Sequence, residues 1–297
     1  MEKNVKCFYH SADHDGRASG YIVSQFYGGN LELYGINYGQ KFPWNMVSPG
    51  DTVVMVDFCL EPFSDMIRLY DLLSSSEGGE FIWIDHHKSS LAAFNEMLLN
   101  HDIDFDKGLW DISVGIDEGA ACLKAWKRFF VSNPVPYFIK LISFYDTWQL
   151  HENQSILPFH YGLRLYNTNP ENTDLWHSLN SNENVLNIIL EGKTIIKFVD
   201  QENESYAMAT SFETELDGYR ALAINRGLMN SRIFESIEEI ENFDIQILFS
   251  WMKNKWKIAL FSVTGAIDVS KIAVKHGGGG HPGAAGFLCD NLPFKLK

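Results

Sequence analysis

The sequence predicts an α/β protein, with an N-terminal domain whose mainly parallel sheet is flanked by helices, a helical connector and a smaller C-terminal α/β domain. Three observations predict this fold class. Short apolar segments alternate with helix-compatible sequence in the first part of the chain, helical spacing prevails from residue 119 to about residue 190, and strand-like segments return afterwards. The length of 297 residues suits two domains. We expect these to span 1–182 and 209–297, with the connector over 183–208.

The first domain is expected to have a βα rhythm. Its best strand candidates are short, apolar and rich in β-branched or aromatic residues, and they lie at 5–9, 53–56 and 81–84. Residues 31–38 are a weaker strand candidate, and residues 62–73 carry apolar side chains at helical spacing. Such alternation predicts a largely parallel sheet with helices on its faces.

The rest of the chain is expected to be helical at first and mixed later. Helices are predicted over 120–131, 137–148, around Leu163, over 175–179 and, as one long helix, over 184–208. Strands are predicted over 220–224, 245–251 and 257–263, followed by a helix over 268–275. The second domain is therefore expected to be the smaller α/β unit.

Composition narrows the classes of function. The 38 Asp and Glu residues outnumber the 24 Lys and Arg residues, which gives a net charge of −14, so most of the surface repels the backbone of long duplex nucleic acid. The sequence has no run of 18 apolar residues, as a membrane span requires. Its four cysteines lie far apart without a C-x-x-C pair, which favours a reducing compartment. We expect a soluble cytoplasmic protein without membrane contact. The negative net charge does not exclude short anionic substrates.

Side chains that bind metals follow each of the three best strand candidates. His10 follows the first, Asp57 the second and Asp85-His86-His87 the third, while the first loop adds Asp13 and Asp15. Ligands bind outside the carboxyl ends of the strands in open parallel sheets, so we expect these residues to converge. Carboxylates beside imidazoles, without thiolates, favour Mn²⁺ or Mg²⁺ over Zn²⁺ or Fe²⁺, and several carboxylates suggest two ions about 3.5 to 4 Å apart. This pattern suits phosphoester hydrolysis.

A second motif is the glycine-rich segment 276–287. Glycines let the backbone approach a ligand closely, and successive exposed N–H groups form a nest for an anion such as phosphate. His281 adds a hydrogen-bond donor. A flexible linker is the alternative interpretation, but apolar sequence flanks the segment on both sides. We therefore expect a phosphate-binding loop there.

With these motifs the sequence resembles the DHH phosphoesterases that carry a DHH-associated C-terminal domain. The resemblance covers nearly the whole chain and rests on Asp85-His86-His87, segment 10–16, Asp57 and segment 277–287. Tyr145-Asp146-Thr147-Trp148 is further similar to oligoribonucleases of the nanoRNase B type. The resemblance implies a catalytic domain over 1–182 and a substrate-binding domain over 209–297.

The resemblance also implies a role for each matching residue. It implies a site for two metal ions, usually Mn²⁺, with Mg²⁺ as the alternative: His10 and Asp13 on one ion, Asp15, His86 and Asp146 on the other, and Asp57 between them. His87 would face the substrate phosphate, and Asp85 would orient a histidine. The catalytic residues are then Asp57, Asp85, His86 and His87, and the substrate-binding residues are His87, Gly278, Gly279, Gly280, His281 and Gly283.

One position departs from the family pattern. Phe261 stands where many relatives have an arginine in a strand of the C-terminal domain. That departure leaves one contact to the substrate phosphate without an assigned residue. Arg226, Lys275 and Arg164 are the candidates to replace it.

The function predicted from the sequence is a metal-dependent phosphodiesterase. It would hydrolyse short oligoribonucleotides to mononucleotides by means of a hydroxide activated by two metal ions. Two alternatives stay open. The first is a phosphatase or phosphodiesterase of a small nucleotide, such as 3′-phosphoadenosine 5′-phosphate, a cyclic nucleotide or a linear dinucleotide, and the second is a non-catalytic nucleotide-binding protein. A homodimer is also left open.

Overall fold

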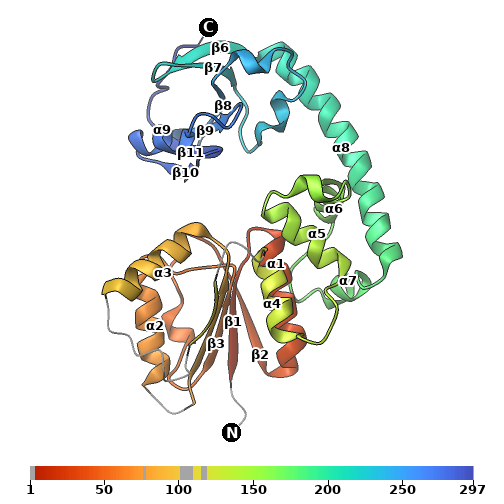
Figure 1. The fold of residues 1–297 in the computed structure, drawn as a ribbon, viewed down its shortest axis with the longest axis vertical. Helices are drawn as coiled ribbons and strands as arrows, with labels where there is room; N and C mark the ends of the chain where they lie inside the picture. The colour runs from red at the N-terminus through yellow and green to blue at the C-terminus, as the bar shows by residue number, and fades with distance from the viewer. Residues whose placement is uncertain (1–3, 76–77, 101–109, 115–118, 297) are drawn as a thin grey trace. The chain divides into compact units, whose positions relative to one another are not determined.

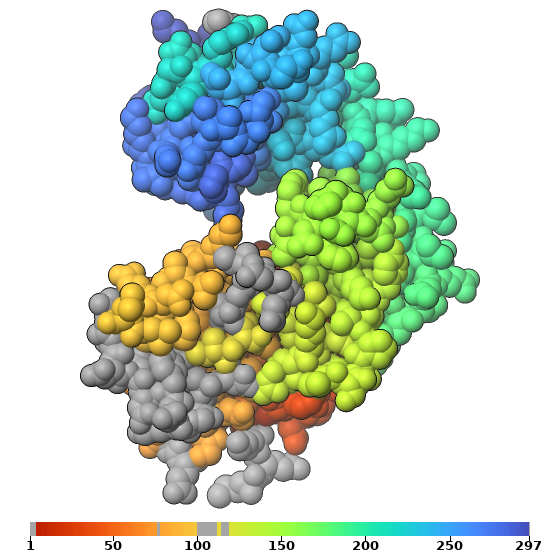
Figure 2. Space-filling model, in the orientation of Figure 1, coloured from red at the N-terminus to blue at the C-terminus, as the bar shows by residue number. Residues whose placement is uncertain are grey.

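The computed structural model describes residues 4–75, 78–100, 110–114 and 119–296. The chain divides into two compact units, Met1–Ile195 and Ile196–Lys297, and the division falls inside helix α8 (Asn182–Thr210) (Figure 1). Figure 2 shows unit 2 in teal and blue. The predicted connector 183–208 lies within α8. Among the described residues, no helix combines the length and the apolar character that a membrane crossing requires.

The predicted fold class is confirmed, with a parallel sheet flanked by helices in unit 1 and a second, mixed sheet in unit 2. The sheet of unit 1 has the order β2-β1-β3-β4-β5, and all of its neighbouring strands are parallel. Its strands are β1 (Val5–His10), β2 (Leu31–Ile36), β3 (Thr52–Val56), β4 (Glu80–Asp85) and β5 (Trp110–Val114). The strand order reverses between β1 and β3, and ligands bind at such a point outside the carboxyl ends of the strands.

Helices cover both faces of this sheet. They are α1 (His14–Tyr27), α2 (Ser64–Ser74), α3 (Lys88–Asn100), α4 (Ala121–Phe129), α5 (Tyr137–Asp146), α6 (Ile156–Leu163) and α7 (Thr173–Ser178). Figure 1 shows α2 and α3 on one face and α1 and α4 on the other. Short 3₁₀ helices occur at Gly28–Asn30, Trp44–Met46 and Leu150–Glu152.

Strands β1, β3 and β4 are mainly apolar, and both of their faces are buried. Cys7 and Tyr9 of β1 lie on the face of the sheet that α1 covers. Phe8 lies on the opposite face, where it packs with Met66 and Leu69 of α2. The alternation follows from the period of two in a strand. This two-sided burial explains why the sequence shows strands as continuous apolar runs. Strand β5 was not predicted, because polar residues interrupt its apolar pattern.

Unit 2 contains a mixed sheet of order β10-β11-β9-β8-β7-β6, in which β7 and β8 are parallel and the other pairs are antiparallel. Its elements are β6 (Phe212–Leu216), β7 (Tyr219–Ile224), β8 (Ile245–Met252), β9 (Lys255–Ser262), α9 (Val269–Lys275), β10 (Gly279–His281) and β11 (Ala284–Cys289), with 3₁₀ helices at Ser231–Phe234 and Ile240–Asn242. Helix α9 packs through Val269 and Ile272 on a core that contains Ile258, Leu260 and Phe287.

The glycine-rich segment differs from its prediction as a loop. Its second half forms an antiparallel hairpin in which Gly280 pairs with Ala285. Gly280 has φ 142°, and a Cβ atom there would lie 2.5 Å from Ala285 Cα, so only glycine fits. Glycines carry no strand signal in the sequence, which is why the hairpin escaped prediction.

Candidate metal centre

The predicted ligands of unit 1 come together at the carboxyl ends of three adjacent strands. His10 ends β1, Asp57 follows β3, and Asp85 ends β4. Helix α1 adds its N-terminal residues, and α5 contributes Asp146 from its last turn. The site thus lies where the strand order reverses, as expected for a ligand site of this architecture.

Two local features fix the turn between β1 and α1. Asp13 caps α1, because its Oδ1 accepts a hydrogen bond of 2.9 Å from the backbone N–H of Gly16. Gly16 is needed for close approach, since a Cβ atom there would lie 2.0 Å from the carbonyl oxygen of His10. The second oxygen of Asp13, Oδ2, lies 2.9 Å from His10 Nδ1. The helix cap therefore also holds this carboxylate beside the imidazole.

Asp57 lies between two groups of side chains. Its φ is 55°, a left-handed conformation that Asp adopts more readily than most residues, and its N–H donates to the carbonyl of Ile84 over 2.8 Å. The carboxylate is buried, with Oδ2 3.4 Å from His10 Nδ1 and Oδ1 3.3 Å from His86 Nε2. Its two oxygens therefore face different imidazoles.

These contacts define two triads. In the first, ligand atoms of His10, Asp13 and Asp57 all lie within 4.8 Å of one another. In the second, the same holds for Asp15, His86 and Asp146, with His86 Nε2 3.0 Å from Asp146 Oδ2 and 3.6 Å from Asp15 Oδ2. Asp57, His86 and His87 form a third such group. The arrangement brings together all six residues predicted as metal ligands, and their binding of metal stays a prediction.

The donor set fits a divalent cation. In the part of the chain that the structure describes, His10 Nδ1, Asp57 Oδ1 and His86 Nε2 are buried without a well-directed hydrogen bond, although other polar atoms lie close to them. Buried polar atoms are costly unless they are satisfied, so these converging ligand atoms suit a bound cation. Carboxylate and imidazole ligands suit Mn²⁺, Mg²⁺ or Zn²⁺.

Burial and the close packing of carboxylates and imidazoles shift the pKa values of the site residues. Burial opposes the charged form of His10, but contacts with the Asp13 and Asp57 carboxylates outweigh it and raise the pKa of His10 to about 10. Likewise, burial is outweighed by contacts with Asp146 and Asp57, which raise the pKa of His86 to about 11. Burial, followed by the charges of Asp57 and Asp146, raises the pKa of Asp15. Without a cation, bound protons thus compensate the carboxylates.

The Asp85-His86-His87 segment turns tightly around the carboxylate of Asp85. Oδ1 of Asp85 accepts hydrogen bonds from the backbone N–H groups of His86, at 2.7 Å, and His87, at 3.2 Å. The same oxygen lies 2.7 Å from His87 Nδ1. Burial alone would raise the pKa of Asp85, but the His87 contact outweighs it and lowers that pKa. Asp85 therefore orients the His87 ring, so that Nε2 is the ring nitrogen left for another contact.

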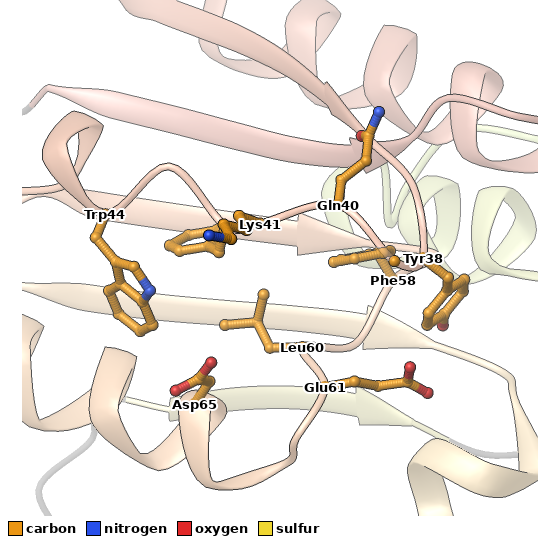
Figure 3. A pocket seen from close by; sticks show the side chains of 10 residues that line it. Tyr38, Gln40, Lys41, Trp44, Phe58, Leu60, Glu61 and Asp65 are labelled. Carbon is orange, nitrogen blue, oxygen red and sulfur yellow. The ribbon is translucent and has the colours of Figure 1, made fainter.

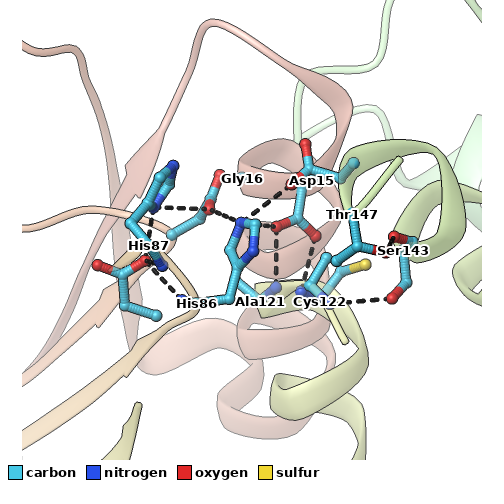
Figure 4. Close-up of polar contacts among 12 residues, drawn as sticks. Asp15, Gly16, His86, His87, Ala121, Cys122, Ser143 and Thr147 are labelled. Carbon is cyan, nitrogen blue, oxygen red and sulfur yellow. Dashed lines mark hydrogen bonds and ion pairs between the residues drawn. The ribbon is translucent and has the colours of Figure 1, made fainter. Parts of the chain in front are cut away.

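Asp15 also has a structural role as a helix cap, which the sequence did not predict. Its Oδ2 accepts a hydrogen bond of 2.9 Å from the N–H of Ala121, and its Oδ1 accepts one of 2.8 Å from Cys122 (Figure 4). Helix α4 has no side-chain cap of its own at Ala120, so Asp15 caps it from α1. No local signal could reveal a cap that is supplied from 106 residues away.

Two histidines near the triads, His14 and His160, were also not predicted from the sequence. The rings of His14 and His160 lie 5.1 Å apart, and His160 stacks on Tyr145 with centroids 3.4 Å apart. Burial lowers the pKa of His14 to about 4 and that of His160 to about 3, so both rings are neutral at physiological pH. They pack beside the ligand-bearing turns without adding charge. His14 lies inside the predicted motif, whereas nothing in the sequence marks His160.

The predicted substrate residues of the second domain lie in unit 2. Gly279, Gly280 and His281 form β10, and Phe261 pairs with Ala284 of β11, next to the same hairpin. Two of the candidates to replace the family arginine have partners, since Lys275 Nζ lies 3.1 Å from Asp217 Oδ2 and the guanidinium of Arg226 lies 4.5 Å from the centre of the Tyr206 ring. In unit 1, Arg164 is exposed and lies 5.7 Å from the centre of the Tyr161 ring.

Comparison with known proteins gives structural likeness at low sequence identity. Neither a protein-family model nor a curated protein sequence matches this chain. Among solved structures, the pGpG-specific phosphodiesterase PggH from Vibrio cholerae is 12% identical, with a TM-score of 0.50 over 97% of this chain and 93% of that one. An exopolyphosphatase-related protein from Bacteroides fragilis is 14% identical, with a TM-score of 0.47 over 96% and 86%. RecJ from Thermus thermophilus, in complex with Mn²⁺, is 14% identical, with a TM-score of 0.45 over 96% and 49%. The chain therefore shares the fold of PggH.

Proposed function

We propose that this protein is a metal-dependent phosphodiesterase of the DHH type that hydrolyses short oligoribonucleotides to mononucleotides. The observation that carries the proposal is the placement of Asp57, whose two carboxylate oxygens lie 3.4 and 3.3 Å from the imidazoles of two separate triads. A shared carboxylate between two clusters of oxygen and nitrogen ligands is the arrangement that two-metal phosphoester hydrolysis needs. A protein that only binds nucleotides has no need of a second cluster.

In this proposal each triad holds one divalent ion, with Mn²⁺ as the first candidate. His10 and Asp13 serve one ion, Asp15, His86 and Asp146 serve the other, and Asp57 serves both. Held by these residues, divalent ions would lower the pKa of water and would stabilise the charge that develops on the phosphoryl oxygens. Their positive charges also offset the four carboxylates, so that an anionic substrate is not repelled.

The remaining predicted residues act on the substrate. His87, whose Nδ1 is engaged by Asp85, has Nε2 available to donate to a phosphate oxygen. In unit 2 we assign Gly278 and the hairpin that contains Gly279, Gly280, His281 and Gly283 to the nucleotide end, because these four hairpin residues are exposed and glycines let a ligand approach the backbone closely. The net charge of −14 disfavours long nucleic acid, which is why the substrate is expected to be short.

The test is turnover of a substrate series by chelator-treated protein before and after Mn²⁺ or Mg²⁺ is restored. A trinucleotide, a pentanucleotide, an RNA of about 24 nucleotides and 3′-phosphoadenosine 5′-phosphate would be compared by kcat/KM. We expect the two short RNAs to be hydrolysed best, and only with metal. Full activity after chelation would overturn the metal assignment, and equal or faster cleavage of the long RNA would overturn the short-substrate assignment.

A linear dinucleotide is the second candidate substrate. The observation that favours it is the shared fold with PggH, which is by its name a pGpG-specific phosphodiesterase. The two candidates differ in their dependence on length. A dinucleotide specialist should cleave dinucleotides much faster than the pentanucleotide, whereas an oligoribonuclease should accept both.

A further inference from the structure

A cavity of about 380 Å³ lies in unit 1 and has no role in the function proposed above. It is formed by the segment after β2 and the segment that joins β3 to α2. Figure 3 shows Tyr38 and Phe58 toward one end, Trp44 at the other, and Leu60 between them. Small-molecule sites in proteins commonly have volumes of roughly 300 to 1,000 Å³. The cavity is therefore large enough for a flat heterocycle.

The cavity adjoins the candidate metal centre. Phe58 directly follows Asp57, and its ring centroid lies 4.8 Å from that of Tyr38. The Tyr38 ring is in turn 5.6 Å from the ring of His10 and 6.2 Å from that of His87. Tyr38 thus separates the cavity from the imidazoles by the thickness of one side chain. A group attached to a phosphate at the metal centre can reach the cavity without crossing the protein core.

The lining is shaped to receive an aromatic ring. Phe58 and Leu60 are largely buried and form an apolar floor, whereas Tyr38 is 38% exposed. The indole of Trp44 is held in place by the guanidinium of Arg68, 3.9 Å from its centre, and Arg68 is not part of the cavity lining. Bases of single-stranded nucleic acids bind proteins chiefly by stacking on such aromatic side chains.

The polar groups of the lining favour a ligand with N–H donors. Glu61 and Asp65 place two carboxylates on the cavity wall, against one ammonium group from Lys41 (Figure 3). A second phosphate would be repelled by this pair. Carboxylates accept hydrogen bonds from the N–H groups of bases. Guanine presents two adjacent N–H donors on its Watson–Crick edge, whereas adenine presents only its amino group there.

We propose that this cavity binds the guanine base of the nucleotide next to the scissile phosphate, an assignment that rests on the phosphodiesterase function proposed above. The aromatic walls would stack against the base, and the two oxygens of one carboxylate, that of Glu61 or Asp65, would accept from its N1–H and N2–H groups. The cavity would then make the enzyme selective for guanine at one position of a short substrate.

The experiment compares pGpG and pApA, which carry the same phosphates, on the wild type and on the double variant Glu61→Gln/Asp65→Asn. With Mn²⁺ present, we expect the wild type to prefer pGpG. In the double variant kcat/KM for pGpG should fall about tenfold, mainly through KM, because a bidentate contact to the base is lost. Hydrolysis of pApA should fall much less, because adenine presents only its amino group to these carboxylates, so the preference should disappear. Two further substrates, in which one or the other guanine of pGpG is replaced by hydrogen, show which of the two bases binds in the cavity.

The control is Asp71→Asn, which removes one negative charge from an exposed position of α2, the helix that carries Asp65. It should leave both substrates unaffected. A guanine preference that survives in the double variant, or no preference in the wild type, would overturn the proposal.

Equilibrium binding of guanosine and adenosine monophosphates keeps the two proposals distinguishable. If the wild type hydrolyses no dinucleotide, the phosphodiesterase function fails, yet tighter binding of guanosine monophosphate that is lost in the double variant would still support the cavity. Equal binding of both nucleotides by the wild type would overturn the cavity assignment.

Discussion

The two ends of the parallel sheet in unit 1 both contain buried charges, but only one end satisfies them within the chain. At the amino end, Lys6 of β1 and Asp51, which precedes β3, are both buried and form an ion pair of 2.7 Å. The same oxygen of Asp51 accepts a hydrogen bond of 2.7 Å from the N–H of Ser48. At the carboxyl end, atoms of His10, Asp57 and His86 are buried close to one another without a well-directed hydrogen bond to any residue that the structure describes.

This difference separates a structural pair from a candidate binding site. The Lys6–Asp51 pair balances one positive charge with one negative charge and needs no further group. The carboxyl end places four carboxylates around two imidazoles, and burial together with mutual repulsion raises the pKa of Asp15. Such a cluster is costly for folding unless a cation occupies it. Buried charge that the chain itself leaves uncompensated therefore marks the functional end of the sheet.

The largest effect is expected for Asp57→Asn. The variant keeps the shape of the side chain but removes the charge that faces both triads, so turnover should fall by roughly a thousandfold or more. The metal content, measured by elemental analysis, should fall as well. Stability of the metal-free protein should not decrease, because burial raises the pKa of Asp57 and its ionised form opposes folding. The control is Asp71→Asn, and an active Asp57→Asn protein with full metal content would contradict the shared-ligand assignment.

The comparison also shows how far the sequence alone could lead. His10, Asp57 and Asp85 were predictable because each follows a strand whose apolar run is visible in the sequence, and parallel strands bring their carboxyl ends to one edge. Asp146 ends a helix instead, so only its resemblance to a family motif singled it out.

Other features depend on long-range packing, which leaves no local pattern. Asp15 caps α4 across 106 positions of sequence, and His160 reaches the site only because α6 packs against α5. The cavity beside Tyr38 forms between two loops, where periodicity gives no information. The hairpin at Gly280 was missed because glycine has low strand propensity.

A second prediction concerns the amino end. Lys6→Met leaves the Asp51 carboxylate buried without its counter-charge, so the free energy of unfolding should fall by about 3 to 5 kcal/mol in a denaturant titration. Affinity for Mn²⁺ should be unchanged, because the candidate metal centre lies at the other end of the strands. Replacement of both partners, Lys6→Met/Asp51→Leu, should restore most of the stability. If the single variant instead lost Mn²⁺ binding at full stability, the proposed separation of roles between the two ends would be wrong.

The third prediction is a pH dependence that only the carboxyl end should show. In the metal-free protein the folded-state pKa of His10, about 10, and that of His86, about 11, exceed the ordinary value of 6.5. Their contribution to stability is therefore complete below pH 6.5 and is lost as the pH rises through the folded values. The raised pKa values of Asp15 and Asp57 act in the same direction, because the folded protein holds protons that the unfolded chain has released.

A metal ion takes the place of these protons, so its affinity should increase with pH by about 1.4 kcal/mol per pH unit for each proton displaced. The measurement is the rise in Tm that saturating Mn²⁺ produces at about pH 6 and at about pH 8. We expect a larger rise at the higher pH in the wild type and in the Lys6→Met/Asp51→Leu variant, and a weaker dependence in Asp57→Asn, which has lost a carboxylate that faces both imidazoles. A rise in Tm that is equal at both pH values would mean that no proton leaves the imidazoles, and His10 and His86 would then have to be removed from the set of metal ligands.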